Sequence, residues 1–389
     1  MKNSDTFDLV VIGGGVIGTG VAWFAIDCGA RVALVERLEF GTGGATAVSG
    51  GILRAFDRDK TAAQAARHGM EIFRNWKTLG LPGETGYCAA GSVYLLDNDS
   101  IQSARVIRDM LHSEPYPVEF VEAQRLNATF KWLKGGAWGG AIYEMRGGYG
   151  SPRQTAKSLA EAALARGLEY FPAQAVARVE QNGDRLSVIT DRSVIQGANV
   201  IVCGGAGTEG ILARSGLALH LDQRIRPRAI GVPSFDGSQE SVQLECSIVD
   251  EVNITYVRPL GGMRYMVGAN LDRWVDDPHS EPSLTCEQVS DGLERGGHVA
   301  NCLDQAVSTG GVCGVDGYTA SRKPVVGRVE GCNGLFVASG FSGGGYKVAP
   351  YVAAVIATEI VGPLRSASLR IIVKNGLGEF AQRPALAAF

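Results

Sequence analysis

The N-terminal part of the chain alternates short apolar runs with a helical pattern, as parallel β-α-β units do. The apolar run at 9–12 is rich in β-branched residues and predicts a buried parallel strand. A helical pattern through Val21 and Phe24 follows and stops at Gly29. A second apolar run at 31–35 predicts the next strand. The chain therefore opens on a strand, a helix and a second strand.

The same two periodicities recur further along the chain. Short strands dominate 87–145 and 221–309, whereas helical patterns with apolar stripes separate the strands elsewhere. Ser151 and Pro152 are expected as the N-cap and first residue of one helix. The predicted segments are helices at about 60–79, 100–111 and 151–166, and strands at 91–96, 173–179, 186–190, 200–203, 254–259, 264–268 and 334–339.

The length and the pattern together predict two domains. A chain of 389 residues is too long for one ordinary core. The fold class expected is α/β with an α+β second domain: a Rossmann-like nucleotide-binding domain and a mainly antiparallel-sheet substrate domain. The predicted ranges are 1–85, 147–220 and 315–375 for the first domain, 86–146 and 221–314 for the second, and 376–389 for a C-terminal tail.

A glycine motif lies between the first strand and the first helix. Gly13, Gly15 and Gly18 fit G-x-G-x-x-G, which permits a tight turn, a close approach of backbone to a pyrophosphate, and close packing of helix on strand. The helix N-terminus offers free N–H groups to the anion. Glu36 ends the second strand, where its carboxylate can bind a ribose but would repel a 2′-phosphate. The motif predicts a dinucleotide that lacks this phosphate.

Two further glycine-rich segments can bring backbone against a flat ligand. The loop at 41–51 consists of small residues throughout, and the turn at 340–345 joins a predicted strand to a predicted helix. Gly204 and Gly205 follow the strand at 200–203 in the same manner. We expect these segments to form the remaining walls of the nucleotide site.

Composition changes this picture only by exclusion. The chain is 45% hydrophobic and 20% charged with a net charge of −3, so nothing favours nucleic acid as a partner. Its eight cysteines contain no C-x-x-C, and free thiols fit a cytoplasmic protein. The five histidines have no metal-binding spacing. We expect no metal, no signal peptide and no membrane span.

With these features in place, the chain resembles the flavin-dependent amine and amino-acid oxidases of the D-amino-acid oxidase superfamily, particularly the sarcosine oxidase and glycine oxidase branch. The resemblance covers nearly the whole length and implies FAD as the cofactor and a fold in which the FAD-binding domain and the substrate domain are interleaved. It also implies oxidation of the C–N bond of a small amino or imino acid, with hydride transfer to flavin N5 and an imine product. It is carried by Gly13 to Gly18 with Glu36, the loop to Arg54, Ala175-Val176, Tyr256 with Pro259, Tyr318-Thr319 with Pro324 and Gly327, Gly340 to Lys347, and Phe380 to Leu386.

The resemblance implies a substrate site and a cofactor site. Arg54 and Lys347 match side chains that hold the substrate carboxylate, and Tyr256 and Tyr318 match pocket tyrosines. An ion pair with Asp57 or Glu36 is the alternative for Arg54, and a solvated helix start is the alternative for Lys347. The predicted cofactor-binding residues are Gly13, Gly15, Val16, Ile17, Gly18, Glu36, Arg37, Thr46, Ser49, Gly50, Gly51, Val176, Gly204, Gly205, Gly340, Gly343, Gly344, Gly345, Tyr346 and Lys347.

Several positions depart from the family pattern. Asp316 stands where sarcosine oxidases tether the flavin through a cysteine, and Cys313 is three residues away, so we expect FAD to be bound non-covalently. Asp316 itself is expected to contact the amine or a second polar group of the substrate, or to be a turn residue bonded to nearby backbone N–H groups. Met266 falls near the lysine that helps oxygen react, with Asn270 at a nearby histidine position. O2 or another acceptor can therefore reoxidise the flavin.

Three functions follow from these observations. The leading one is an FAD-dependent oxidase or dehydrogenase of a small amino or imino acid. The second is an FAD-dependent 2-hydroxy-acid dehydrogenase on the same fold, since a carboxylate clamp would serve either substrate. The third is a non-catalytic FAD-binding subunit of a larger complex.

Overall fold

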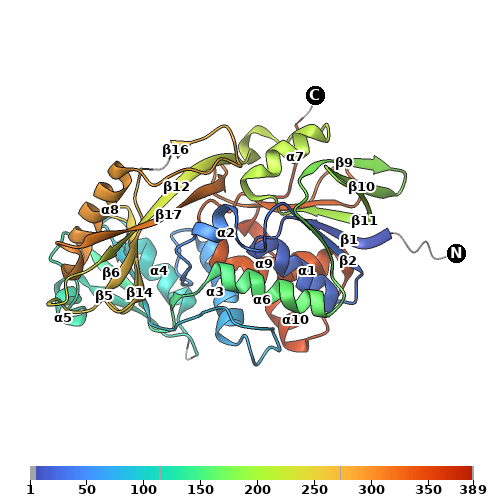
Figure 1. Ribbon diagram of the computed structural model, residues 1–389. Helices are drawn as coiled ribbons and strands as arrows, with labels where there is room; N and C mark the ends of the chain where they lie inside the picture. Colours follow the sequence, from blue (N-terminus) through green and yellow to red (C-terminus); the bar gives the residue numbers. More distant parts are fainter. Residues whose placement is uncertain (1–5, 114, 272, 388–389) are drawn as a thin grey trace.

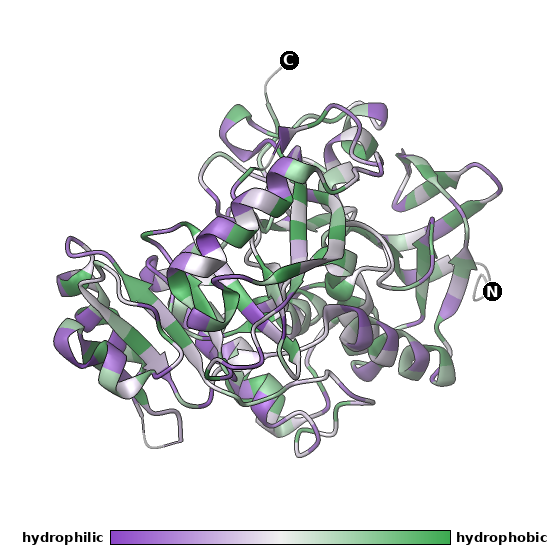
Figure 2. Ribbon diagram, turned by 60° about the vertical axis from the view of Figure 1, so that its left-hand side comes forward, coloured by the Kyte–Doolittle hydropathy of each residue, from purple (hydrophilic) through white to green (hydrophobic). Residues whose placement is uncertain are grey.

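Two large sheets organise the molecule. The computed structural model describes residues 6–113, 115–271 and 273–387. The two sheets lie side by side, and both described ends of the chain are on the side of the first sheet (Figure 1). In Figure 2 the surface helices alternate between hydrophilic and hydrophobic residues, as expected for helices with one buried face. No helix in the described ranges is both long and apolar enough to cross a membrane.

The first sheet is the predicted Rossmann-like sheet. Its order is β18-β19-β11-β1-β2-β8, and β10 and β9 extend it from β11. β1 is parallel to β2 and to β11, and β11 is parallel to β19. The bounds are β1 (Thr6–Ile12), β2 (Val32–Glu36), β8 (Glu169–Pro172), β9 (Val176–Asn182), β10 (Arg185–Thr190), β11 (Val194–Val202), β18 (Val325–Arg328) and β19 (Leu335–Ser339).

The second sheet is mainly antiparallel, as the sequence predicts. Its order is β16-β12-β15-β14-β13-β4-β6-β5, with β17 paired to β12; only β13 and β4 run parallel among these described pairs. A two-stranded sheet joins β3 (Ile52–Leu53) to β7 (Gly148–Tyr149). The bounds are β4 (Ser92–Leu96), β5 (Val118–Glu122), β6 (Gly140–Glu144), β12 (Arg226–Asp236), β13 (Ser247–Asp250), β14 (Thr255–Gly261), β15 (Arg264–Val267), β16 (Arg273–Trp274) and β17 (Val307–Tyr318).

Helices α1, α6 and α9 lie together on one face of the first sheet (Figure 1). Glycine brings two of the helix pairs unusually close. A Cβ on Gly20 would lie 2.8 Å from the Cβ of Ala353, and a Cβ on Gly69 would lie 2.0 Å from the carbonyl oxygen of Lys347. The helix bounds are α1 (Val16–Asp27), α2 (Gly44–Val48), α3 (Lys60–Arg74), α4 (Ile101–Leu111), α5 (Leu126–Thr129), α6 (Pro152–Ala165), α7 (Thr208–Arg214), α8 (Cys286–Val299), α9 (Gly345–Val361) and α10 (Ala367–Val373).

The structure confirms the predicted fold class and corrects two local predictions. The segment at 41–51 is not a loop throughout, because α2 covers its middle. The helix expected at about 60–79 ends at Arg74. Ser151 does cap α6, accepting a hydrogen bond from the Gln154 N–H. The domain boundaries remain a prediction, and the one between 314 and 315 falls inside β17.

Candidate active site

A large cavity lies where the carboxyl end of β1 meets the second sheet. Its volume is about 1080 Å³, and its walls come from both sheets and from the glycine-rich segments. One end is lined by Glu36 and Arg37, and another part by Arg54 and Lys347. A cavity of this size can hold a dinucleotide and a small substrate together.

The turn before α1 is shaped by its glycines. Gly13 has φ +108°, and a Cβ there would lie 2.5 Å from the Cys203 carbonyl oxygen. A Cβ on Gly18 would lie 1.9 Å from the Gly13 carbonyl oxygen, so this glycine serves packing and does not line the cavity. Gly15 does line it, and beside it the Val16 N–H donates to the Thr46 hydroxyl over 3.1 Å. The helix N-terminus is thus presented to the cavity, as an anion site requires.

Glu36 is fixed by backbone hydrogen bonds on both carboxylate oxygens. The Gly14 N–H donates to Oε2 over 2.5 Å, and the Leu38 N–H donates to Oε1 over 2.7 Å. A carboxylate oxygen has a second lone pair, so each can also accept from a ligand hydroxyl. The bonds therefore orient Glu36 on the cavity wall without exhausting its acceptors.

The glycine-rich parts of the cavity wall leave room for FAD, because their glycines carry no side chains. A Cβ on Gly205 would meet nothing within 4 Å, and one on Gly44 would meet only the Val315 carbonyl oxygen, at 3.8 Å. Both glycines line the cavity. Backbone exposed in this way allows a flat ring and a pyrophosphate to approach closely. Every predicted cofactor-binding residue except Gly18 lies on the cavity wall.

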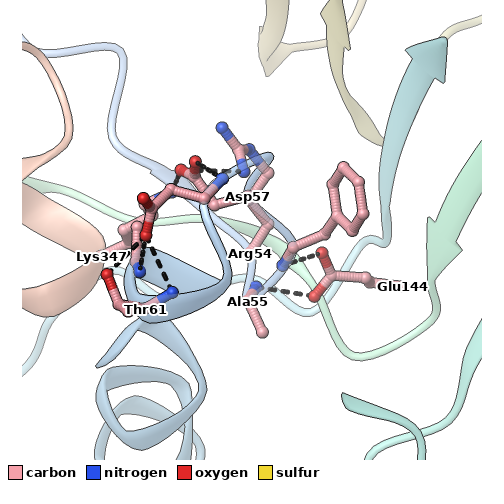
Figure 3. Close-up of polar contacts among 9 residues, drawn as sticks. Arg54, Ala55, Asp57, Thr61, Glu144 and Lys347 are labelled. Carbon is pink, nitrogen blue, oxygen red and sulfur yellow. Dashed lines mark hydrogen bonds and ion pairs between the residues drawn. The ribbon is translucent and has the colours of Figure 1, made fainter. Parts of the chain in front are cut away.

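Arg54, Asp57 and Lys347 form a charged cluster at the other part of the cavity (Figure 3). Lys347 Nζ lies 2.5 Å from Asp57 Oδ2, and Arg54 Nη1 lies 3.8 Å from the same oxygen. Lys347, in the first turn of α9, is only 7% exposed. With two cations and one anion, the cluster carries one net positive charge.

The protonation of this cluster depends on its internal contacts. Burial and the nearby Arg54 lower the pKa of Lys347, while Asp57 opposes this shift. Burial alone would raise the pKa of Asp57, but Lys347 and Arg54 outweigh it and hold the pKa at about 2. Asp57 therefore stays ionised across the neutral range.

Asp57 also bears on the predicted carboxylate clamp. The sequence alone suggests Asp57 only as an alternative ion-pair partner of Arg54. In the structure Asp57 contacts both cations, so an anion already lies between Arg54 and Lys347. An added carboxylate has to share these two cations with Asp57 or displace it.

The two predicted tyrosines line the cavity. The ring of Tyr256 fits between two glycines, because a Cβ on Gly50 would lie 2.6 Å from it and a Cβ on Gly268 would lie 2.5 Å from it. The guanidinium of Arg228 lies over the ring of Tyr318, 4.9 Å from its centroid. These contacts hold both rings on the wall beside the glycine-rich segments.

Asp316 also lines the cavity, but backbone groups engage its carboxylate. Oδ1 accepts from the Gly317 N–H over 2.7 Å, and Oδ2 accepts from the Gly343 N–H over 2.9 Å. The side chain therefore ties β17 to the turn before α9. This geometry favours the expected turn role of Asp316.

Met266 is placed differently from the other predicted catalytic residues. It is buried on β15, opposite Arg258 of β14, and does not line the cavity. Asn270, a little further on, does line it. Of the eight cysteines, all within the described ranges, Cys203 alone lies on the wall, and burial raises its pKa. Cys313 is paired with Gly231 of β12, which lines the cavity, but Cys313 itself does not.

Among the five histidines, all of them described, only His279 lines the cavity. Burial and the nearby Arg37 lower its pKa, and Glu36 also acts on it. His279 is therefore at the nucleotide end of the cavity. The Arg54 and Lys347 part has no histidine on its wall.

Sequence reasoning missed several residues beside the charged cluster. The Arg54 guanidinium lies over the ring of Tyr94, 4.9 Å from the ring centroid. Burial raises the pKa of Tyr94 to about 12. Arg58 pairs with Glu251 across 3.5 Å, and both line the cavity. The spacing of Arg54 and Asp57 was the one local signal available, since the other contacts join distant segments.

Comparisons with known proteins bear on the family of this chain. A profile of the family described as DAO, FAD dependent oxidoreductase, matches residues 8–359. An uncharacterized oxidoreductase, YurR of Bacillus subtilis (strain 168), is 25% identical over 368 residues, covering 91% of this chain and 94% of that protein. The glycine oxidase of Geobacillus kaustophilus (strain HTA426) is 23% identical over 370 residues, covering 90% and 92%.

Solved structures share the fold. The L-proline dehydrogenase of P. horikoshii superposes with a TM-score of 0.80 at 18% identity, covering 94% of this chain and 96% of that one. The family profile spans most of the chain, from β1 to the end of α9. The chain belongs to the DAO family of FAD-dependent oxidoreductases.

Proposed function

We propose that this FAD-dependent oxidoreductase oxidises the C–N bond of a small amino or imino acid. The observation that carries the proposal is the pair of cations, Arg54 and Lys347, on the wall of the cavity that also presents the nucleotide cradle. A planar guanidinium and an ammonium together suit a carboxylate. The names of two similar proteins, a glycine oxidase and an L-proline dehydrogenase, are consistent with such a substrate.

The residues of the chain would bind and orient the substrate. Arg54 and Lys347 would hold its carboxylate, and the rings of Tyr256 and Tyr318 would confine its carbon and nitrogen atoms. Bound FAD supplies the chemistry of hydride acceptance. The protein contributes position, exclusion of water and the charges around the substrate.

A 2-hydroxy acid would use the same two cations but needs a base for its hydroxyl group. His279 is the one histidine on the cavity wall among the described residues, and it lies at the nucleotide end. An amine can lose its proton to solvent before binding, so it makes no such demand. The geometry therefore favours an amino or imino acid.

The proposal is tested by anaerobic mixing of the purified enzyme with a panel of amino, imino and hydroxy acids. Loss of the oxidised flavin absorbance should occur with an amino or imino acid. Admitting air afterwards measures whether O2 or another acceptor reoxidises the flavin. Bleaching by hydroxy acids alone would show that the substrate class is wrong.

We also propose that Glu36 binds the ribose of FAD, held without a covalent bond. Glu36→Ala should weaken FAD binding because one charge-assisted hydrogen bond is worth roughly 1.5–3 kcal/mol. Acid precipitation should release the flavin, after which FAD affinity is measured by fluorescence titration of the apoprotein. Glu161→Ala, on the exposed side of α6, is the control. Equal FAD affinities in wild type, Glu36→Ala and Glu161→Ala would contradict this role and show that Glu36 only forms hydrogen bonds with the backbone.

For the carboxylate clamp, Arg54→Met and Lys347→Met should each lower kcat/KM by orders of magnitude with FAD still bound. Loss of a charged partner in a partly desolvated pocket costs about 2–5 kcal/mol. The double variant should be less than additive, because both cations act on one carboxylate.

Lys374→Met, an exposed lysine after α10, serves as the matched control and should behave as wild type. The readout is steady-state kinetics on the best carboxylate substrate from the panel. Near-normal kcat/KM in either single clamp variant would contradict the clamp and favour substrates without a carboxylate.

A further inference from the structure

A buried carboxylate from the second sheet reaches the segment that carries Arg54. Glu144, the last residue of β6, is 1% exposed. Its Oε2 accepts from the Ala55 N–H over 2.7 Å, and its Oε1 accepts from the Phe56 N–H over 2.8 Å (Figure 3). The Tyr116 hydroxyl donates a third hydrogen bond to Oε2.

This arrangement is unusual because burying a carboxylate is unfavourable without strong compensation. No ion pair to Glu144 occurs within the described ranges, so hydrogen bonds provide its compensation. Tyr116 is itself fully buried, and the guanidinium groups of Arg67 and Arg74 lie 4.8 and 5.2 Å from its ring centroid. Each carboxylate oxygen of Glu144 therefore has at least one hydrogen-bond donor, as a buried carboxylate requires.

The two N–H donors have a particular place in the chain. Ala55 and Phe56 lie between Arg54 and Asp57, the two members of the charged cluster on this segment. Holding both intervening amides against one carboxylate fixes the backbone on either side. The negative charge of Glu144 also acts on Lys347, whose pKa it raises in opposition to burial.

We infer that Glu144 is a positioning residue for substrate binding: it fixes the 54–57 segment so that Arg54 and Asp57 face Lys347 in the geometry that accepts a carboxylate. This inference rests on the proposed function. Glu144 does not line the cavity, so it acts through Arg54 and Asp57 and not by touching substrate.

The test compares Glu144→Gln with wild type in binding matched ligands. Glutamine keeps the volume, but its amide has one oxygen for two N–H donors, and its NH2 would face the other donor. Acetate and benzoate serve as carboxylate probes, and acetamide and benzamide as neutral isosteres, each titrated against the holoenzyme by flavin difference absorbance. Glu119→Gln, an exposed carboxylate on the neighbouring β5, is the control.

Glu144→Gln should weaken carboxylate binding by about tenfold or more and leave amide binding unchanged. Glu119→Gln should match wild type with every probe. Equal carboxylate affinity in Glu144→Gln and wild type, or an equal loss for carboxylates and amides, would overturn the inference and leave Glu144 with a purely structural role.

A wild-type enzyme that binds no carboxylate would instead contradict the proposed function itself. If Glu144→Gln does not retain FAD, Tyr116→Phe provides the second test. This variant keeps Glu144 and its two hydrogen bonds from the backbone N–H groups but removes the hydrogen bond from the Tyr116 hydroxyl. Binding of the carboxylate probes should therefore weaken about threefold, and binding of the amide probes should not change. Wild-type carboxylate affinity in Tyr116→Phe would then overturn the inference.

Discussion

The ion pair between Lys347 and Asp57 is the contact on which the charged part of the cavity depends. Lys347 is almost fully buried in the first turn of α9, and Arg54 adds a second cation nearby. A buried ammonium and a partly buried guanidinium this close would repel each other and favour loss of a proton from the lysine. Asp57, 2.5 Å from Nζ, opposes this loss, and with Lys347 protonated the three side chains carry one net positive charge. That remaining charge suits the anionic substrate that we propose.

The fold brings the members of this cluster together from separate layers. Gly69 lets α3 approach the backbone of Lys347, which places the start of α9 beside the segment after β3. Glu144 then joins that segment to the second sheet through two backbone N–H groups. Because the cluster lies where the first sheet's helices meet the second sheet, the same architecture that holds the nucleotide cradle also sets the position of the charges. The junction between the two sheets therefore positions both the nucleotide cradle and the charged cluster.

The parts of this account that could be predicted from sequence are local. The turn at Gly13 to Gly18 and the strand before Glu36 lie close together in the chain, so spacing alone identifies them. Helix α2 could not be predicted, because its small residues form no apolar stripe with helical periodicity. The role of Glu144 cannot be predicted from sequence, because its hydrogen-bond partners Ala55 and Phe56 lie far away in the chain and only the tertiary fold brings them together. Spacing along a strand predicts Met266 as a site residue, but spacing does not show whether a side chain reaches the cavity, and that of Met266 does not line it.

The most direct test of the central claim, that Asp57 keeps Lys347 charged for carboxylate binding, is the pH dependence of benzoate binding to wild type and Asp57→Asn. Binding needs protonated Lys347, so it is present below the pKa of this lysine and is lost as the pH rises through it. Without Asp57 that pKa falls further, since burial and Arg54 both lower it. The account predicts that the pH at which binding is half lost decreases by about one unit or more in Asp57→Asn. The same half-loss pH in both proteins would contradict it.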